Sequence, residues 1–556
     1  MNHKLKTLII GFIVGLGLII IYTLISPLVF HPPVSATPAQ EKVELIDNLG
    51  NYHYPITTTS DLAQQYFDQG LILSYGFNHA EAARAFREAS RLDPNCAMCS
   101  WGLAYVLGPN INAPMAVEQV PEAWQAMQQA ITLSNNNASP KEQAYIQALA
   151  KRYIAIPIAD RSFLDLAYAQ AMKQVAQDYP DDLDAATLYA EALMDTMPWD
   201  YWQDNGEIKP EAKPILATLA SVLTKNPQHP GATHLYIHAT EKEQPRLAIP
   251  AADNLRNLVP ASGHLVHMPS HIYIRVGRYQ DAVIANQKAV IADRQYLASS
   301  HPESVYTIGY IPHNYHFLWF AAVMSGQSKI AMAAAAQTAA VDPSRMRNPG
   351  MSGVLQHFSV VPLYTEVRFG QWEQILETPA PKPDLKYAKG VWHYARGMAL
   401  TAQGNPSAAE QELAQLQTLM ADPELAATTI WSFNSTASIL EIAAEVLSGS
   451  IASLEPDYTT AISHFQQAIA LEDQLVYTEP PDWYSPTRNL LGTILLQANQ
   501  PEAAAQAFRD DLEIYPANGW SLHGLLQSLQ AQGKTAEAEA IQQQFQQAWQ
   551  YADVVL

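Results

Sequence analysis

The chain has few basic residues for its length, and this scarcity restricts the partners that it can bind. Its 556 residues contain 32 Lys and Arg against 53 Asp and Glu, which gives a formal net charge of −21. Proteins that bind nucleic acid concentrate positive charge, because they displace the counterions of the phosphate backbone. The composition therefore argues against a nucleic-acid partner and is typical of a solvated acidic surface.

The sequence also lacks the short motifs of common hydrolases and nucleotide-binding enzymes. It contains no HExxH motif, no GxSxG nucleophile turn and no glycine-rich phosphate loop. Nothing else in the sequence locates a substrate. These absences do not favour an enzyme over a binding protein.

Strict alternation of apolar and polar residues, which is typical of β-strands, is rare in this chain. Ala, Leu and Gln are abundant instead, and 48% of the residues are hydrophobic. Residues of this kind favour helices. We therefore expect an all-α fold, and the length suits a solenoid, which grows without a single core.

The N-terminal thirty residues predict a membrane anchor. Lys4 and Lys6 precede an uncharged run at 7–30 that is rich in Ile and Leu. A helix of this length spans the hydrocarbon layer of a bilayer, and the preceding positive charge keeps residues 1–6 in the cytoplasm. The bulk of the chain is then extracytoplasmic, periplasmic or lumenal, and the Pro- and Thr-containing stretch 31–60 is expected to be a linker.

A cleaved signal peptide is the alternative for the same segment. Val34, Ser35 and Ala36 place small residues where a signal peptidase would cut. The apolar run is longer than an ordinary signal-peptide core, which favours the uncleaved anchor. Both alternatives export the remainder of the chain.

A repeat of 34 residues runs along the sequence. Counted from Ala63, Gly70 is at position 8, Ala82 at position 20, Phe86 at position 24 and Pro94 at position 32. Small residues at positions 8 and 20 let two helices cross closely, and Pro at position 32 ends the second helix. The same spacing recurs from Ser485, with Gly492, Ala504, Phe508 and Pro516.

These positions resemble the signature of the tetratricopeptide-repeat (TPR) superfamily, and weaker units between the two good matches extend the resemblance over most of the chain. The stretches FNHAEAARAFREASRLDPNCAMCSWGLAYVLGPNIN, GHLVHMPSHIYIRVGRY and WHYARGMA are similar to a large bacterial family of repeat proteins. The resemblance implies a right-handed superhelical solenoid, whose concave groove is lined by the first helix of each unit. We expect an N-terminal array at 61–345 and a C-terminal array at 346–556.

Histidine is concentrated in one part of the chain. Nine of the 17 histidines fall between His229 and His316. Counted in the repeat frame, eight side chains from three consecutive first helices face the groove: His234, His238, Glu241, His264, His267, His271, His313 and His316. The i,i+4 pairs among them each share one helix face, although Pro269 interrupts the pair His267 and His271.

The groove histidines have two interpretations. Imidazole pairs on one helix face are suitable ligands for Zn²⁺ or Cu²⁺, and a metal set would be drawn from His234, His238, Glu241, His267, His271 and His316. Alternatively, the same side chains line a polar groove that hydrogen-bonds to a peptide. With Glu and a metal-bound water, the first interpretation extends to metal-dependent hydrolysis.

Cys96 and Cys99 are the only cysteines. They form a local disulfide in an oxidising compartment, or remain an unpaired buried couple, or, with Met98 and His79, provide a soft Cu(I) site. No His follows Cys99 directly, which excludes a c-type haem attachment site. The segments Gly108–Asn112 and Pro198–Trp202 either cap the groove or pack as ordinary connections.

The main prediction is an exported TPR scaffold that binds a protein or peptide partner in its concave groove and is attached to a membrane by its N-terminal helix. The alternative is a transition-metal-binding or metal-dependent hydrolytic protein that uses the histidines at 234–316.

Overall fold

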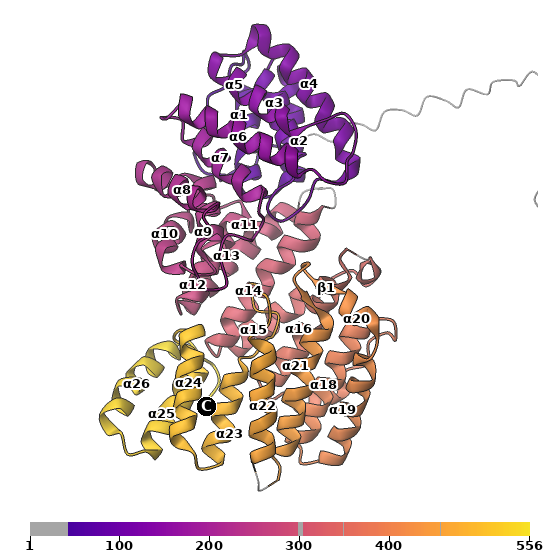
Figure 1. The fold of residues 1–556 in the computed structure, drawn as a ribbon, viewed down its shortest axis with the longest axis vertical. Coiled ribbons are helices and arrows are strands. Elements are labelled where there is room, and N and C mark those ends of the chain that lie inside the picture. The colour runs from indigo at the N-terminus through magenta and orange to yellow at the C-terminus, as the bar shows by residue number, and fades with distance from the viewer. Residues whose placement is uncertain (1–42, 299–303, 349, 456–457) are drawn as a thin grey trace, which may run out of the picture. The chain divides into compact units, whose positions relative to one another are not determined.

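Successive helices pack against each other in pairs along nearly the whole chain (Figure 1). The computed structural model describes residues 43–298, 304–348, 350–455 and 458–556. Residues 45–556 form one compact unit, which contains all the helices and strands named below. Helices dominate the described chain, as the composition predicts.

The α-helices are α1 (Asp61–Tyr75), α2 (His79–Leu92), α3 (Ala97–Val106), α4 (Val120–Asn137), α5 (Pro140–Leu149), α6 (Ser162–Asp178), α7 (Leu183–Asp195), α8 (Lys213–Lys225), α9 (Pro230–Thr240), α10 (Ile249–Leu255), α11 (Gly263–His267), α12 (Pro269–Arg275), α13 (Tyr279–Leu297), α14 (Ile311–Met324), α15 (Ser328–Thr338), α16 (Ser352–Arg368), α17 (Trp372–Glu377), α18 (Lys386–Ala402), α19 (Pro406–Met420), α20 (Pro423–Ala427), α21 (Thr436–Ala452), α22 (Thr459–Glu472), α23 (Thr487–Gln497), α24 (Pro501–Ile514), α25 (Gly519–Ala531) and α26 (Thr535–Ala548). Short η segments, five residues or fewer, are η1 (Val117–Gln119), η2 (Ala150–Arg152), η3 (Pro245–Ala248), η4 (Tyr306–Tyr310) and η5 (Arg345–Arg347). Two short strands, β1 (Thr429–Ile430) and β2 (Asn434–Ser435), pair antiparallel, with Thr429 opposite Ser435.

The packing between repeats confirms a TPR-like arrangement at both ends of the array. A Cβ atom added to Gly70 on α1 would lie 2.8 Å from the ring of Phe86 on α2, and one added to Gly102 on α3 would lie 2.4 Å from it. One aromatic ring thus fills the space between three helices, and a side chain at either glycine would displace it. Phe508 on α24 has the same position between Gly492 and Gly524.

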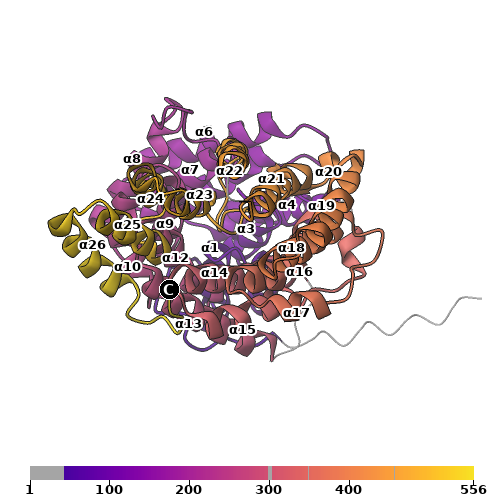
Figure 2. The ribbon, with the colours of Figure 1, turned by 90° about the horizontal axis from the view of Figure 1, so that it is seen from below.

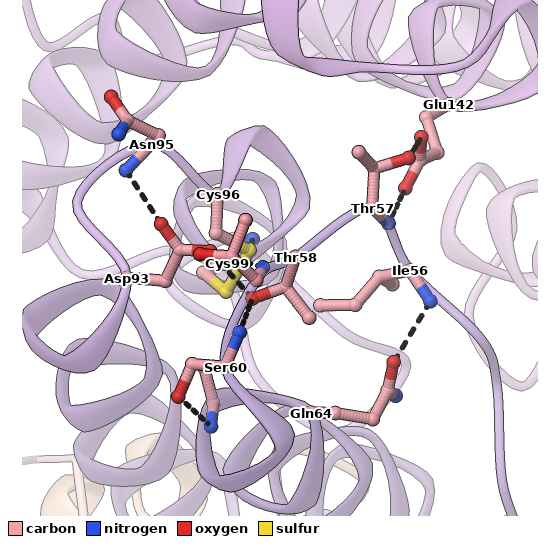
Figure 3. The surroundings of a disulfide bond; sticks show 12 residues. Ile56, Thr57, Thr58, Ser60, Gln64, Asp93, Asn95, Cys96, Cys99 and Glu142 are labelled. Carbon is pink, nitrogen blue, oxygen red and sulfur yellow. Dashed lines mark hydrogen bonds between the residues drawn. A yellow bond between two sulfur atoms is a disulfide. The ribbon is translucent and has the colours of Figure 1, made fainter.

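Residues 45–60 contain no helix or strand but are bound to the array by hydrogen bonds. Tyr52 Oη donates to Asp184 Oδ2 over 2.7 Å, and Tyr54 Oη donates to Asp182 Oδ2 over 2.9 Å. The Thr57 amide donates to Glu142 Oε1 (Figure 3). The described part of the expected 31–60 linker is therefore held in place by carboxylates of the array.

The predicted anchor at 7–30 lies outside the described residues. Among the helices that the structure does describe, none combines the length and apolar character needed to cross a bilayer.

The two expected arrays are continuous. The helices on either side of residue 345, α15 and α16, pack on each other. Further along, α18, α19, α21 and α22 lie side by side both in Figure 1 and in the perpendicular view of Figure 2. The β1–β2 hairpin precedes α21, and β1 contacts α16.

We expect Gly524→Ala to destabilise the C-terminal repeats. The added Cβ would lie 2.1 Å from the Phe508 ring, so the ring or a helix must move, at a cost of about 1–3 kcal/mol. Gln527→Ala on the same helix, at an exposed position, is the control and should change stability by less than about 0.5 kcal/mol. Thermal unfolding followed by circular dichroism measures both variants, and equal midpoints would contradict the tight Gly–Phe packing.

Candidate metal centre

Helix α9 brings the first pair of histidines into the interior. It starts at Pro230, and the side chain of His229 caps it by accepting a hydrogen bond from the Ala232 amide over 3.1 Å. Proline suits this first position because its missing N–H would have no helical partner there. His234 and His238 are then four residues apart on one face, and both are buried.

The second pair lies where α11 gives way to α12. Pro269 begins α12, but Met268 keeps helical dihedral angles (φ −49°, ψ −37°), so the turn continues between the two short helices. His267 and His271 therefore still share a face, and their Nε2 atoms are 3.0 Å apart. The interruption that Pro269 introduces does not separate this pair.

Three imidazoles from α9 and α11 form what we call the first trio: His234, His238 and His264. One ring nitrogen from each lies within 4.8 Å of the others. The ring centroids of His234 and His238 are 4.8 Å apart, and those of His234 and His264 are 5.0 Å apart. All three side chains are 4% exposed or less.

Hydrogen bonds determine which ring nitrogen carries the proton in His234 and His238. His234 Nδ1–H donates to the Tyr75 carbonyl over 2.5 Å, and His238 Nδ1–H donates to Glu241 Oε2 over 3.2 Å. Within the part of the chain that the structure describes, Nε2 of both residues and both ring nitrogens of His264 have no hydrogen-bond partner. Buried polar atoms of this kind are rare in folded proteins, and each needs an explanation.

The first trio is neutral. Burial, together with neighbouring imidazoles, lowers the pKa of His234, His238 and His264 well below the usual value. A neutral imidazole whose Nδ1 carries the proton presents a lone pair at Nε2. The trio therefore offers unprotonated nitrogen donors near neutral pH, which is the form that binds a metal.

A second trio lies next to the first, and consists of His267, His271 and His313. Their candidate ligand atoms also lie within 4.8 Å of one another. The ring of His267 is 4.9 Å from that of His271 and 5.0 Å from that of His313. Phe317, one turn after His313 on α14, packs against all three rings at 4.4–4.8 Å.

Two carboxylates contact His271 of the second trio. His271 Nδ1 lies 2.7 Å from Glu479 Oε2 and 3.0 Å from Glu241 Oε2. Burial lowers the pKa of His271, but the two carboxylates outweigh this effect and raise it to about 9. Burial raises the pKa of Glu241 and of Glu479. We call these two glutamates and the two trios together the histidine centre.

Strained aromatic residues surround the histidine centre. Phe77, Trp199 and Trp431 are the three aromatic residues with positive φ in the described chain, at 55°, 63° and 50°. The Phe77 ring is 4.4 Å from that of His234, Trp199 is 5.0 Å from His238, and Trp431 is 6.5 Å from His313. Bulky residues rarely adopt this conformation, and such strain concentrates at functional sites.

The structure places one sequence-predicted ligand elsewhere. His316 is on α14 with His313, but its ring stacks on Trp319 at 5.1 Å and lies 5.5 Å from His357. It belongs to neither trio. The other predicted groove residues, His234, His238, Glu241, His264, His267, His271 and His313, come together in the histidine centre.

Several groups in the centre could not be identified from the sequence. Glu479 lies 208 residues beyond His271, and no local motif marks it. Tyr75 acts through its main-chain carbonyl, which every residue type has. The sequence does not indicate the positive φ at Phe77 or Trp199 either. It identified the segment Pro198–Trp202, but not the backbone conformation of Trp199.

The two cysteines form a disulfide at the start of α3 (Figure 3). The Cα atoms of Cys96 and Cys99 are 5.4 Å apart, and both side chains are buried. Next to them, Asp93 accepts hydrogen bonds from Thr58 and from the Thr59 amide. In this oxidised state the sulfurs are not available as thiolate ligands for a soft metal.

Comparison with known proteins identifies no relative by sequence: no protein-family model matches the chain, and no curated protein matches it. The expected membership of a bacterial repeat family therefore has no support. Among solved structures, the chain is similar to Cut9 in the APC/C Cut9–Hcn1 hetero-tetramer (13% identity, 87% of this chain and 73% of that chain, TM-score 0.29). It is also similar to the human IFIT1 dimer with m7Gppp-AAAA (13% identity, 89% of this chain and 91% of that chain, TM-score 0.31). A third similar structure is the P58(IPK) TPR domain (11% identity, 85% of this chain and 99% of that chain, TM-score 0.21). These TM-scores are too low to support an inference about partners or ligands.

Proposed function

We propose that this protein is a helical-repeat scaffold that binds a first-row transition-metal ion, Zn²⁺ or Cu²⁺, at the first trio. The observation that carries the proposal has two parts: His234 and His238 donate through Nδ1 and keep a buried Nε2 with no partner among the described residues, and one ring nitrogen from each lies within 4.8 Å of one from His264. Such a set leaves lone pairs unsatisfied unless a cation shares them.

The contacts behind the first trio also suit a metal site. Histidine ligands of metals almost always donate their second N–H to a carboxylate or a main-chain carbonyl, which fixes the tautomer and the ring. Glu241 accepts this hydrogen bond from His238, and the Tyr75 carbonyl accepts it from His234. Three nitrogen ligands from protein leave one position of a tetrahedral ion free.

Burial favours metal binding over the other functions that the sequence predicts for these histidines. A peptide in a groove contacts exposed side chains, but the imidazoles of the first trio are 4% exposed or less and are covered by Phe77 and Tyr310. Hydrolysis also requires a substrate to reach the free metal position. Partner binding by other surfaces of the array agrees with the general use of helical repeats as scaffolds.

We expect His264→Ala to lower the metal content of the purified full-length protein by about one ion per chain, because the trio loses one of its three ligands. The protein is treated with a chelator, reloaded with Zn²⁺ or Cu²⁺ in separate arms, and analysed by elemental mass spectrometry. Glu241→Gln should weaken the binding of this ion by about 10–100-fold, because it replaces the carboxylate that accepts from His238 by a neutral amide.

His316→Ala is the matched control, since His316 is equally buried but lies outside both trios. It should leave the metal content unchanged. Circular dichroism verifies that each variant is folded. A wild-type protein that retains no ion after reloading, or a folded His264→Ala variant with unchanged content, would contradict the proposal.

We also propose that the protein is exported and stays attached to a membrane. The apolar run at 7–30 after Lys4 and Lys6 supports this, as does the Cys96–Cys99 disulfide, because disulfides persist mainly in oxidising compartments.

We expect the protein to fractionate with membranes and to keep its N-terminal segment, as an intact-mass measurement would show. A maleimide reagent applied after denaturation should modify neither cysteine before reduction and both after it. Cleavage near Ala36 would contradict the anchor but not export, whereas two free thiols in freshly isolated protein would contradict the oxidising location.

A further inference from the structure

In the second trio, as in the first, surrounding groups determine which ring nitrogens of two histidines carry the proton. Asn286 Nδ2 donates to the Ala282 carbonyl over 2.8 Å, so Asn286 Oδ1 faces His267. His267 Nδ1 lies 2.7 Å from that oxygen and must carry the proton. His267 Nε2 is therefore left with a lone pair.

His271 has the same tautomer, for a different reason. Its Nδ1 lies against Oε2 of Glu479 and Oε2 of Glu241, and carboxylates accept hydrogen bonds. His271 Nε2 faces His267 Nε2 at 3.0 Å, so that when His271 is neutral, the form in which it would bind a metal, two lone pairs face each other. Two lone pairs at this distance repel each other unless a cation lies against both.

Either a proton or a metal ion would satisfy this pair, and the third imidazole distinguishes between them. A proton joins two nitrogens and leaves no role for His313, whose ring lies 5.0 Å from that of His267 and 5.8 Å from that of His271. A metal ion uses all three. The arrangement of three imidazoles, two of them held by Asn286 and Glu479, is the pattern of ligands and supporting acceptors found at metal sites.

The charge balance leads to the same conclusion. The side chains of Glu241 and Glu479 are each 3% exposed, and buried carboxylates require cations close by. Arg275 approaches Glu479, with Nε 3.9 Å from Oε1. A divalent ion in each trio would supply the positive charge next to Glu241, which lies against His238 of one trio and His271 of the other.

We infer that His267, His271 and His313 bind a second divalent transition-metal ion, so that the histidine centre holds two ions whose ligands share Glu241 as supporting carboxylate. This inference rests on the proposed function at the first trio. The shared oxygen makes the two sites interdependent, because moving Glu241 affects one ligand of each ion.

The test counts Zn²⁺ ions per chain in full-length protein reloaded after chelation. We expect two ions in the wild type, one in His313→Ala, one in His264→Ala and none in the double variant, with His316→Ala unchanged at two. One ion in the wild type that only His264→Ala removes would overturn the second site and leave the proposed function intact. No ion in the wild type would overturn both.

The two glutamates provide a sharper comparison. Among the histidines of the two trios, Glu479 hydrogen-bonds to His271 alone, so Glu479→Gln should weaken the binding of one ion by about 10–100-fold and leave the binding of the other unchanged. Glu241→Gln should weaken both. If both variants weaken the binding of the same single ion and leave the other ion unchanged, Glu241 does not support both sites.

A measurement on the wild type makes the inference independent of the folding of any variant. In protein loaded with two equivalents of Cu²⁺, electron paramagnetic resonance should show two bound spins per chain, both with hyperfine structure from imidazole nitrogens. Binding of a single Cu²⁺ ion, or a second Cu²⁺ signal without nitrogen hyperfine structure, would overturn the two-ion centre.

Discussion

Hydrogen bonds that tie imidazole Nδ1 atoms to nearby acceptors determine what the histidine centre can do. His234 is tied to a main-chain carbonyl, His238 and His271 to carboxylates, and His267 to the Asn286 amide oxygen. In each case Nε2 is the ring nitrogen left for a metal ion, and the Nε2 atoms of His267 and His271 face each other. A cluster of freely rotating histidines would satisfy its own nitrogens by exchanging protons, whereas this cluster keeps its donor atoms available.

The repeat architecture makes such an arrangement possible because it places short helices close together. Histidines four residues apart share a face on α9, and those at the junction of α11 and α12 do the same. Each pair can meet its neighbour only where the helices approach closely. The apolar rings of Phe77 and Phe317 then keep the imidazoles apart from other polar groups, so that burial holds them neutral, with the exception of His271.

The centre also connects distant parts of the chain. Glu479 follows α22, in the C-terminal part of the array, and reaches His271 on α12. The loop of Trp431, at the tip of the β1–β2 hairpin, reaches His313. A metal ion bound here would link these segments, and its binding free energy would add to the stability of the folded array. The positive φ angles of Phe77, Trp199 and Trp431 store strain at the same place, which packing elsewhere must offset.

Sequence alone determined the helical class, the repeats and most of the cluster. Spacing identified Gly70, Phe86 and the histidine pairs, because helix periodicity is a local property that one segment of chain carries. Only the tertiary structure decided which of those histidines meet. It separated His316 from His313 although both are on one helix, and it added Glu479, since contacts between distant segments depend on how helices stack. The tertiary structure also decided the histidine tautomers, because the proton of a neutral imidazole stays on the ring nitrogen that lies next to a hydrogen-bond acceptor.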